Sequence, residues 1–130
     1  MIMLDTHAWV WWTIDPDQMT ETQQREIAGS EDVGIGVSAI SCWEIAKLCE
    51  YGRLALPVGL SDWFDAALQY PGVTLLELTP AVAVESISLP GDFHRDPSDQ
   101  IIVATARVHG FPLVTSDDKI AAYPHVQTVL

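Results

Sequence analysis

The chain has 130 residues, 48% of them hydrophobic, which can form one sizeable core and predicts a single domain over residues 1–130. Only six Lys and Arg stand against 18 Asp and Glu, a formal net charge of −12, so the chain lacks the basic surface of an ordinary nucleic-acid-binding protein. No segment reaches the roughly 18 apolar residues of a membrane helix. No basic leader precedes an apolar run, so we expect a cytoplasmic protein with no membrane segment.

The acidic excess has two interpretations. Most of the carboxylates can simply form a solvated surface that keeps the protein soluble. Alternatively, some of them converge on a divalent cation, which would supply the positive charge that the side chains lack. Composition alone does not decide between the two.

The first half of the chain predicts strands and helices in alternation. Met1–Leu4 is an apolar strand candidate that ends at the polar triplet Asp5-Thr6-His7. The next elements expected are a tryptophan-rich helix over Ala8–Ile14, a helix from the N-cap Thr20 to Ala28 stopped by Gly29, a strand over Val33–Ala39, a helix over Ser41–Tyr51, and a helix over Leu60–Tyr70 capped by Ser61.

The second half continues the alternation. The elements expected are a strand over Val73–Leu78, a short helix over Pro80–Ser86, a loop over Gly91–Arg95, a helix opened by Asp96-Pro97 that ends at His109 before Gly110, a strand over Leu113–Thr115, and a candidate fifth strand over Val126–Val129. Strands that alternate with helices predict a parallel sheet covered on both faces. We therefore expect an α/β fold with three layers, α/β/α, around a mostly parallel central sheet of four to five strands.

Four acidic residues are expected at one edge of this sheet. Asp5 follows the first strand directly, and Asp117 lies two residues past the fourth. Glu44 lies early in the helix after the second strand, and Asp99 lies in the first turn of the helix that leads into the fourth. Right-handed crossovers bring the carboxyl ends of parallel strands to a common edge, where such folds bind ligands. Carboxylates gathered there repel one another unless Mg²⁺ or Mn²⁺ binds them, so the sequence predicts a metal site.

Each of these acids also has a purely structural alternative, in which it only satisfies backbone amides. The alternatives are an N-cap at Asp5, a capping box of Ser41 with Glu44, an N-cap at Asp96 with Asp99 in the same first turn, and a turn at Asp117-Asp118.

The order and spacing of the polar motifs resemble those of a known family. The segments concerned are the apolar strand followed by Asp5-Thr6, the serines Ser38 and Ser41 with Glu44, the run Asp99-Gln100-Ile101-Ile102-Val103-Ala104-Thr105-Ala106, and Leu113-Val114-Thr115-Ser116-Asp117. Together they resemble the PIN-domain family, and within it the VapC-type toxins of bacterial toxin–antitoxin pairs. The segment around Asp99 and the segment that ends at Asp117 are the most specific parts.

This resemblance implies a fold, an activity and partners. It implies a metal-dependent endoribonuclease that uses Mg²⁺ or Mn²⁺ to cleave RNA with a metal-activated water. It also implies a homodimer inhibited by a small VapB-like antitoxin. By motif position, the catalytic and metal-binding quartet is Asp5, Glu44, Asp99 and Asp117. Thr6 and Ser116 match the polar neighbours that hydrogen-bond these carboxylates, and Asp96 and Asp118 are additional supporting acids.

Other side chains near these motifs allow more than one interpretation. Arg95, beside the start of the Asp96 helix, is our candidate for a substrate phosphate contact, although a solvated loop residue is an equal interpretation. His7 and His94 are not assigned a catalytic role, because a two-metal mechanism does not require histidine. The five tryptophans could stack RNA bases, but their helical spacing favours core or interface positions.

Two other parallel α/β folds with acids at strand ends are disfavoured. A receiver-type signalling domain needs a phosphoacceptor Asp after its central strand, and none follows the second or third strand here. A haloacid-dehalogenase-like phosphatase needs a second Asp two residues after the first, where this chain has His7. A PIN-like domain that has lost catalysis and only binds a partner remains the alternative function.

Overall fold

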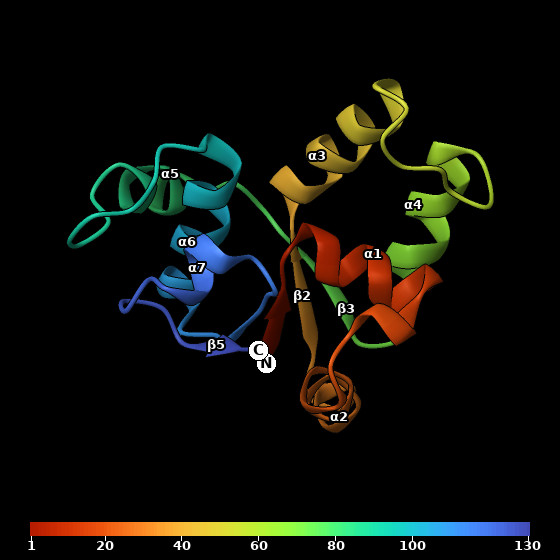
Figure 1. The fold of residues 1–130 in the computed structure, drawn as a ribbon, viewed down its shortest axis with the longest axis horizontal. Coiled ribbons are helices and arrows are strands. Elements are labelled where there is room, and N and C mark those ends of the chain that lie inside the picture. The colour runs from red at the N-terminus through yellow and green to blue at the C-terminus, as the bar shows by residue number, and fades with distance from the viewer.

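The computed structural model describes all residues from Met1 to Leu130 and contains one five-stranded sheet. All neighbouring strands are parallel, in the order β3-β2-β1-β4-β5 (Figure 1). The strands are β1 (Ile2–Leu4), β2 (Ile35–Ser38), β3 (Val73–Leu76), β4 (Leu113–Val114) and β5 (Thr128–Val129). This confirms the expected α/β fold, including its fifth strand.

Helices connect the strands. They are α1 (Thr6–Ile14), the short 3-10 helix η1 (Pro16–Gln18), α2 (Glu21–Ser30), α3 (Ala39–Glu50), α4 (Leu60–Gln69), α5 (Pro80–Ser86), α6 (Pro97–His109) and α7 (Asp118–Ala121). None of them is long and apolar enough to cross a membrane.

Two apolar cores lie on opposite faces of the sheet, because successive side chains of a strand point to opposite sides. Within β1, Ile2 and Leu4 pack into one core with Trp9 of α1 and Trp63 of α4. Met3, between them, packs into the second core with residues of α6 and α7. Helices therefore cover both faces, and Figure 1 shows α1 and α4 on one side of the strands and α5, α6 and α7 on the other.

Several helix boundaries differ from the expected ones. The second strand ends at Ser38, whose hydroxyl accepts the Ile40 amide at 3.2 Å and caps α3, so α3 begins at Ala39. Helix α4 is capped at Gly59 and not at Ser61. Helix α2 continues through Gly29 to Ser30, because the roughly 1 kcal/mol cost of an interior glycine is small beside the packing of the helix.

The aromatic residues divide between the core and the surface. Trp9 and Trp63 are buried with their ring centroids 5.1 Å apart. Trp12 contacts Tyr70 and lines an apolar cavity of about 360 Å³ between α1 and α4. Trp43 is 55% exposed on α3. Trp9 and Trp63 therefore occupy core positions, while stacking of RNA bases on the exposed Trp43 stays a prediction. The two cysteines of α3, Cys42 and Cys49, are free.

Candidate active site

Asp5 lies at the carboxyl end of β1 and is buried. Its Oδ1 accepts the Ala8 amide at 2.9 Å, so it caps α1. Its Oδ2 accepts the Thr115 hydroxyl at 2.5 Å, across the sheet from the end of β4. The capping role and the predicted position at the sheet edge are therefore both correct, since each oxygen serves a different neighbour.

Glu44 lies in the second turn of α3, because that helix begins earlier than the sequence suggests. The Ser41–Glu44 capping box is therefore absent. Thr6 Oγ1 instead lies 2.5 Å from Glu44 Oε1 and 2.9 Å from Ser41 Oγ. A threonine hydroxyl has one proton, so it donates to the carboxylate and accepts from the serine. Thr6 thus holds Glu44 toward the end of β1.

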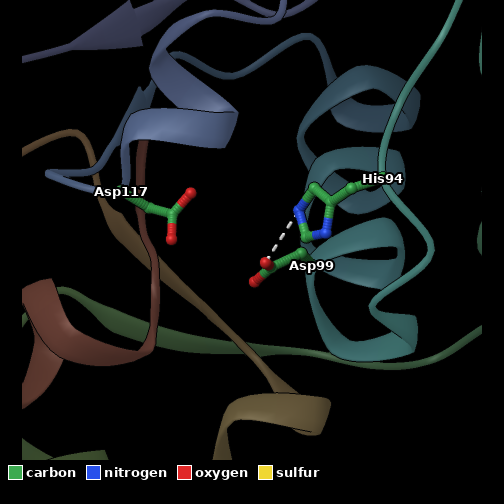
Figure 2. A group of neighbouring side chains, drawn as sticks. All are labelled: His94, Asp99 and Asp117. Carbon is green, nitrogen blue, oxygen red and sulfur yellow. Dashed lines mark ion pairs between the residues drawn. The ribbon is translucent and has the colours of Figure 1, made fainter.

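Asp96 and Asp99 occupy the first turn of α6. Asp96 is the N-cap, and its Oδ1 accepts the amides of Ser98 and Asp99 at 2.9 and 3.3 Å. With the backbone amides served by Asp96, the Asp99 carboxylate is directed to the sheet edge. Its Oδ2 lies 3.0 Å from His94 Nε2 (Figure 2).

Asp117 follows β4 and caps the short helix α7. Its Oδ1 accepts the amides of Lys119 and Ile120 at 2.9 and 3.0 Å. The Asp117 amide donates to Thr115 Oγ1 at 3.1 Å, and that hydroxyl in turn donates to Asp5. Thr115 therefore fixes Asp5 and Asp117 relative to each other.

These side chains enclose one acidic cavity of about 170 Å³. Its lining residues are Asp5, Thr6, His7, Glu44, Asp96, Asp99, Ile102 and Asp117, with no Lys or Arg among them. Burial, reinforced by the charges of Asp96 and the other acids, raises the pKa of Asp99 to about 7. Burial likewise raises the pKa of Asp5 and of Glu44. The ionised forms of these carboxylates are therefore destabilised in the cavity, and a bound cation would relieve that penalty.

The comparisons with known proteins agree with this geometry. The family model for the PIN domain matches residues 2–126. The chain belongs to the PIN domain family. It is 32% identical over 128 residues to Ribonuclease VapC22 of Mycobacterium tuberculosis, a match that covers 98% of this chain and 95% of the relative.

Solved structures share the fold of this PIN domain. One is VapBC2 from Rickettsia felis bound to a promoter DNA fragment, with a TM-score of 0.68 and 17% identity over 98% of this chain and 97% of that one. Another is FitAcB from Neisseria gonorrhoeae, with a TM-score of 0.65 and 19% identity over 100% of this chain and 97% of that one.

The structure brings most of the predicted site residues of this PIN domain together, but not all. Asp118 begins α7 and does not line the acidic cavity. Ser116 faces Gln23, whose Nε2 donates to its hydroxyl at 3.1 Å, so the expected contact between Ser116 and a carboxylate is absent. Thr115, one residue earlier, makes that contact because its side chain points to the opposite face of the strand end. Arg95 borders a different cavity, described below.

The donor set of the PIN domain fits a divalent cation. Carboxylate oxygens are the ligands that Mg²⁺ and Mn²⁺ prefer, and here they converge without a cationic side chain to neutralise them. A second observation comes from His94, whose Nε2 is buried without a hydrogen-bond partner. The atoms that His94, Asp99 and Asp117 can offer as ligands all lie within 4.8 Å of one another.

Sequence reasoning assigned no role to Thr115 and declined one for His94. Strand alternation indicates that Thr115 and Ser116 point to opposite faces, so one of them faces the carboxylates, but it does not say which one. For His94 the sequence holds no such signal, because only the fold of its loop brings Nε2 to 3.0 Å from Asp99 Oδ2.

Proposed function

We propose that this PIN domain is a metal-dependent endoribonuclease and the toxin of a toxin–antitoxin pair. The observation that carries the proposal is the convergence of Asp5, Glu44, Asp99 and Asp117 in one cavity without Lys or Arg. The name of the mycobacterial relative, a ribonuclease, supports the activity. A toxin–antitoxin complex from Klebsiella pneumoniae, which has the same fold with a TM-score of 0.65 and 18% identity, supports the biological context.

The four acids of the quartet would hold Mg²⁺ or Mn²⁺. A divalent cation would lower the pKa of a bound water and stabilise negative charge on the phosphate. The protein contributes the orientation of its carboxylates: Thr115 sets Asp5 against Asp117, and Thr6 sets Glu44. Asp96 lines the same cavity and adds negative charge to it while it caps α6.

The substrate phosphate would be contacted by Arg95. This residue borders a cavity of about 650 Å³ together with residues of the loop before α6, and it is adjacent in sequence to Asp96. A guanidinium suits this role because it presents several donors to phosphate oxygens. Its place in the sequence directly before Asp96, which lines the acidic cavity, supports a phosphate contact near the scissile bond.

The partner would be a small VapB-like antitoxin that inhibits the enzyme. The net charge of −12 and the acidic cavity favour a cationic inhibitory segment. For the expected homodimer, α5 and its C-cap residue offer the exposed apolar side chains Val84 and Ile87, which are 65% and 87% exposed.

The activity is tested with purified protein and a structured, end-labelled RNA. We expect internal cleavage when Mn²⁺ or Mg²⁺ is added and no cleavage in excess EDTA, because the carboxylates act only through the cation. Cleavage that persists unchanged in EDTA would contradict the mechanism. If no cleavage occurs although the metal binds, the domain is one that only binds a partner.

The Thr115 hydroxyl provides a second test. Thr115→Val keeps the size of this buried side chain but removes the donor to Asp5 Oδ2. Groups that orient ligand carboxylates contribute ~10–100-fold to metal affinity or activity, so we expect a loss of that size. Ser116→Ala, which removes a hydroxyl bound to Gln23 on the other face, is the matched control and should stay within a few fold of wild type. Equal losses in both variants, measured as initial rates at saturating Mn²⁺, would contradict this role of Thr115.

A further inference from the structure

His94 lies in the loop between α5 and α6 and is directed at Asp99 and Asp117, two of the acids that line the acidic cavity. Figure 2 shows its imidazole facing Asp99 and Asp117, with Asp117 contributed by the segment after β4. Since the mechanism proposed above uses only carboxylates, the function of this ring is not explained by it.

The ring is held in place from several sides. Phe93 packs against it with ring centroids 4.5 Å apart. Gln100 Nε2 donates to the His94 carbonyl oxygen at 3.1 Å and fixes the backbone. Tyr123 packs on Phe93, and its hydroxyl donates to the Pro90 carbonyl oxygen at 2.5 Å, which anchors the preceding loop. The imidazole is therefore preorganised before anything binds.

The Nε2 atom of His94, which faces Asp99, makes no hydrogen bond. His94 Nε2 is buried and makes no hydrogen bond of acceptable geometry, although Asp99 Oδ2 lies only 3.0 Å away. A separation of roughly 3.0 Å is that of two adjacent ligands on an octahedral cation with bonds of ~2.1 Å. The pair is close enough for an ion pair, and its spacing also fits two ligands of one cation.

We propose that His94 Nε2 is a ligand of the divalent cation, beside Asp99 and Asp117, and that it gives the site a preference for Mn²⁺ over Mg²⁺. This inference rests on the proposed function, which requires a cation in this cavity. Imidazole nitrogen binds first-row transition metals well, whereas Mg²⁺ favours oxygen ligands. Coordination through Nε2 moves the ring proton to Nδ1, which gives up only a long contact of 3.4 Å from the Asp96 amide.

The direct test is pulsed electron paramagnetic resonance of bound Mn²⁺. We expect the spectrum of the wild-type protein to show coupling to a ligand ¹⁴N and the spectrum of His94→Asn to lack it. His7→Asn is the matched control, because His7 also lines the cavity but belongs to α1, and this variant should keep the coupling. Loss of the coupling in His7→Asn and its retention in His94→Asn would overturn the proposal.

Binding affinity gives an independent readout by calorimetry. Because even residues that only orient metal ligands contribute ~10–100-fold to affinity, His94→Asn should weaken Mn²⁺ binding at least tenfold. Mg²⁺ binding should change less, because Mg²⁺ favours oxygen ligands, so the selectivity for Mn²⁺ falls. Equal losses for both ions would indicate a structural role and overturn the proposal. Mn²⁺ that binds without ¹⁴N coupling would also overturn it and leave the proposed function intact, whereas no Mn²⁺ binding to the wild type would contradict the proposed function itself.

Discussion

Asp99→Asn is expected to reduce metal-dependent RNA cleavage on the order of 10³-fold, since a cation site contributes several kcal/mol to the stabilisation of the transition state. The substitution keeps the size of the side chain and removes the carboxylate whose pKa is raised to about 7. The raised pKa means that the ionised carboxylate of Asp99 is less stable in the folded protein than in water. We therefore expect metal-free Asp99→Asn to be at least as stable as wild type at pH 8, although it is inactive.

The measurement combines cleavage rates with urea denaturation of the metal-free protein. Asp65→Asn, which removes an exposed carboxylate on α4, is the matched control and should change neither quantity. Activity near the wild-type level in Asp99→Asn would exclude Asp99 from the site. Lost activity together with a large loss of stability would instead make Asp99 a structural residue.

Stability without metal is expected to fall as the pH rises from about 4 to 8. The pKa of Asp99 is about 7 in the fold against an ordinary value of 3.8, so between these values the folded state binds more protons than the unfolded state. Unfolding then releases a proton, and raising the pH favours unfolding. The pKa values of Asp5 and Glu44 are raised as well and act in the same direction.

Mn²⁺ should reverse this loss of stability. At a concentration 100-fold above Kd, the cation adds about 2.7 kcal/mol to the free energy of unfolding, which corresponds to about 10 °C in Tm for a domain of this size. The gain should be larger at pH 8 than at pH 5, where protons compete for the same carboxylates. Differential scanning fluorimetry across this pH range, with and without EDTA, measures it. A Tm that Mn²⁺ leaves unchanged at every pH would show that the cavity does not bind the ion.

The order of strands and helices follows from local sequence patterns. Asp96-Pro97 opens α6 as predicted, and Gly110 ends it with φ at +71°, a backbone conformation that glycine adopts without strain. Thr20 and Gln23 form the capping box that begins α2. These signals are readable because the residues that determine a helix end lie within a few positions of it.

The local capping signals predicted the wrong helix start where tertiary contacts override local preference. Ser41 and Glu44 have the spacing of a capping box, but Ser38 caps α3 because β2 ends there against its neighbours. Ser61 has a side chain suited to capping, but the N-cap of α4 is Gly59, two residues earlier. In both cases two candidate starts lie close together, and packing against the sheet selects between them.

The sequence by itself determined the fold class, the family and which four carboxylates meet at the edge of the sheet. The carboxylates meet because parallel crossovers bring the ends of distant strands together whatever the details of packing, and the family follows from the resemblance of the motifs. Only the tertiary structure decided which neighbours serve those carboxylates: Thr115 and not Ser116 bonds to Asp5, and His94 faces Asp99. Those choices depend on the direction of a single side chain. A shift of one residue along a strand reverses that direction, and no local pattern encodes the fold of the loop that carries His94.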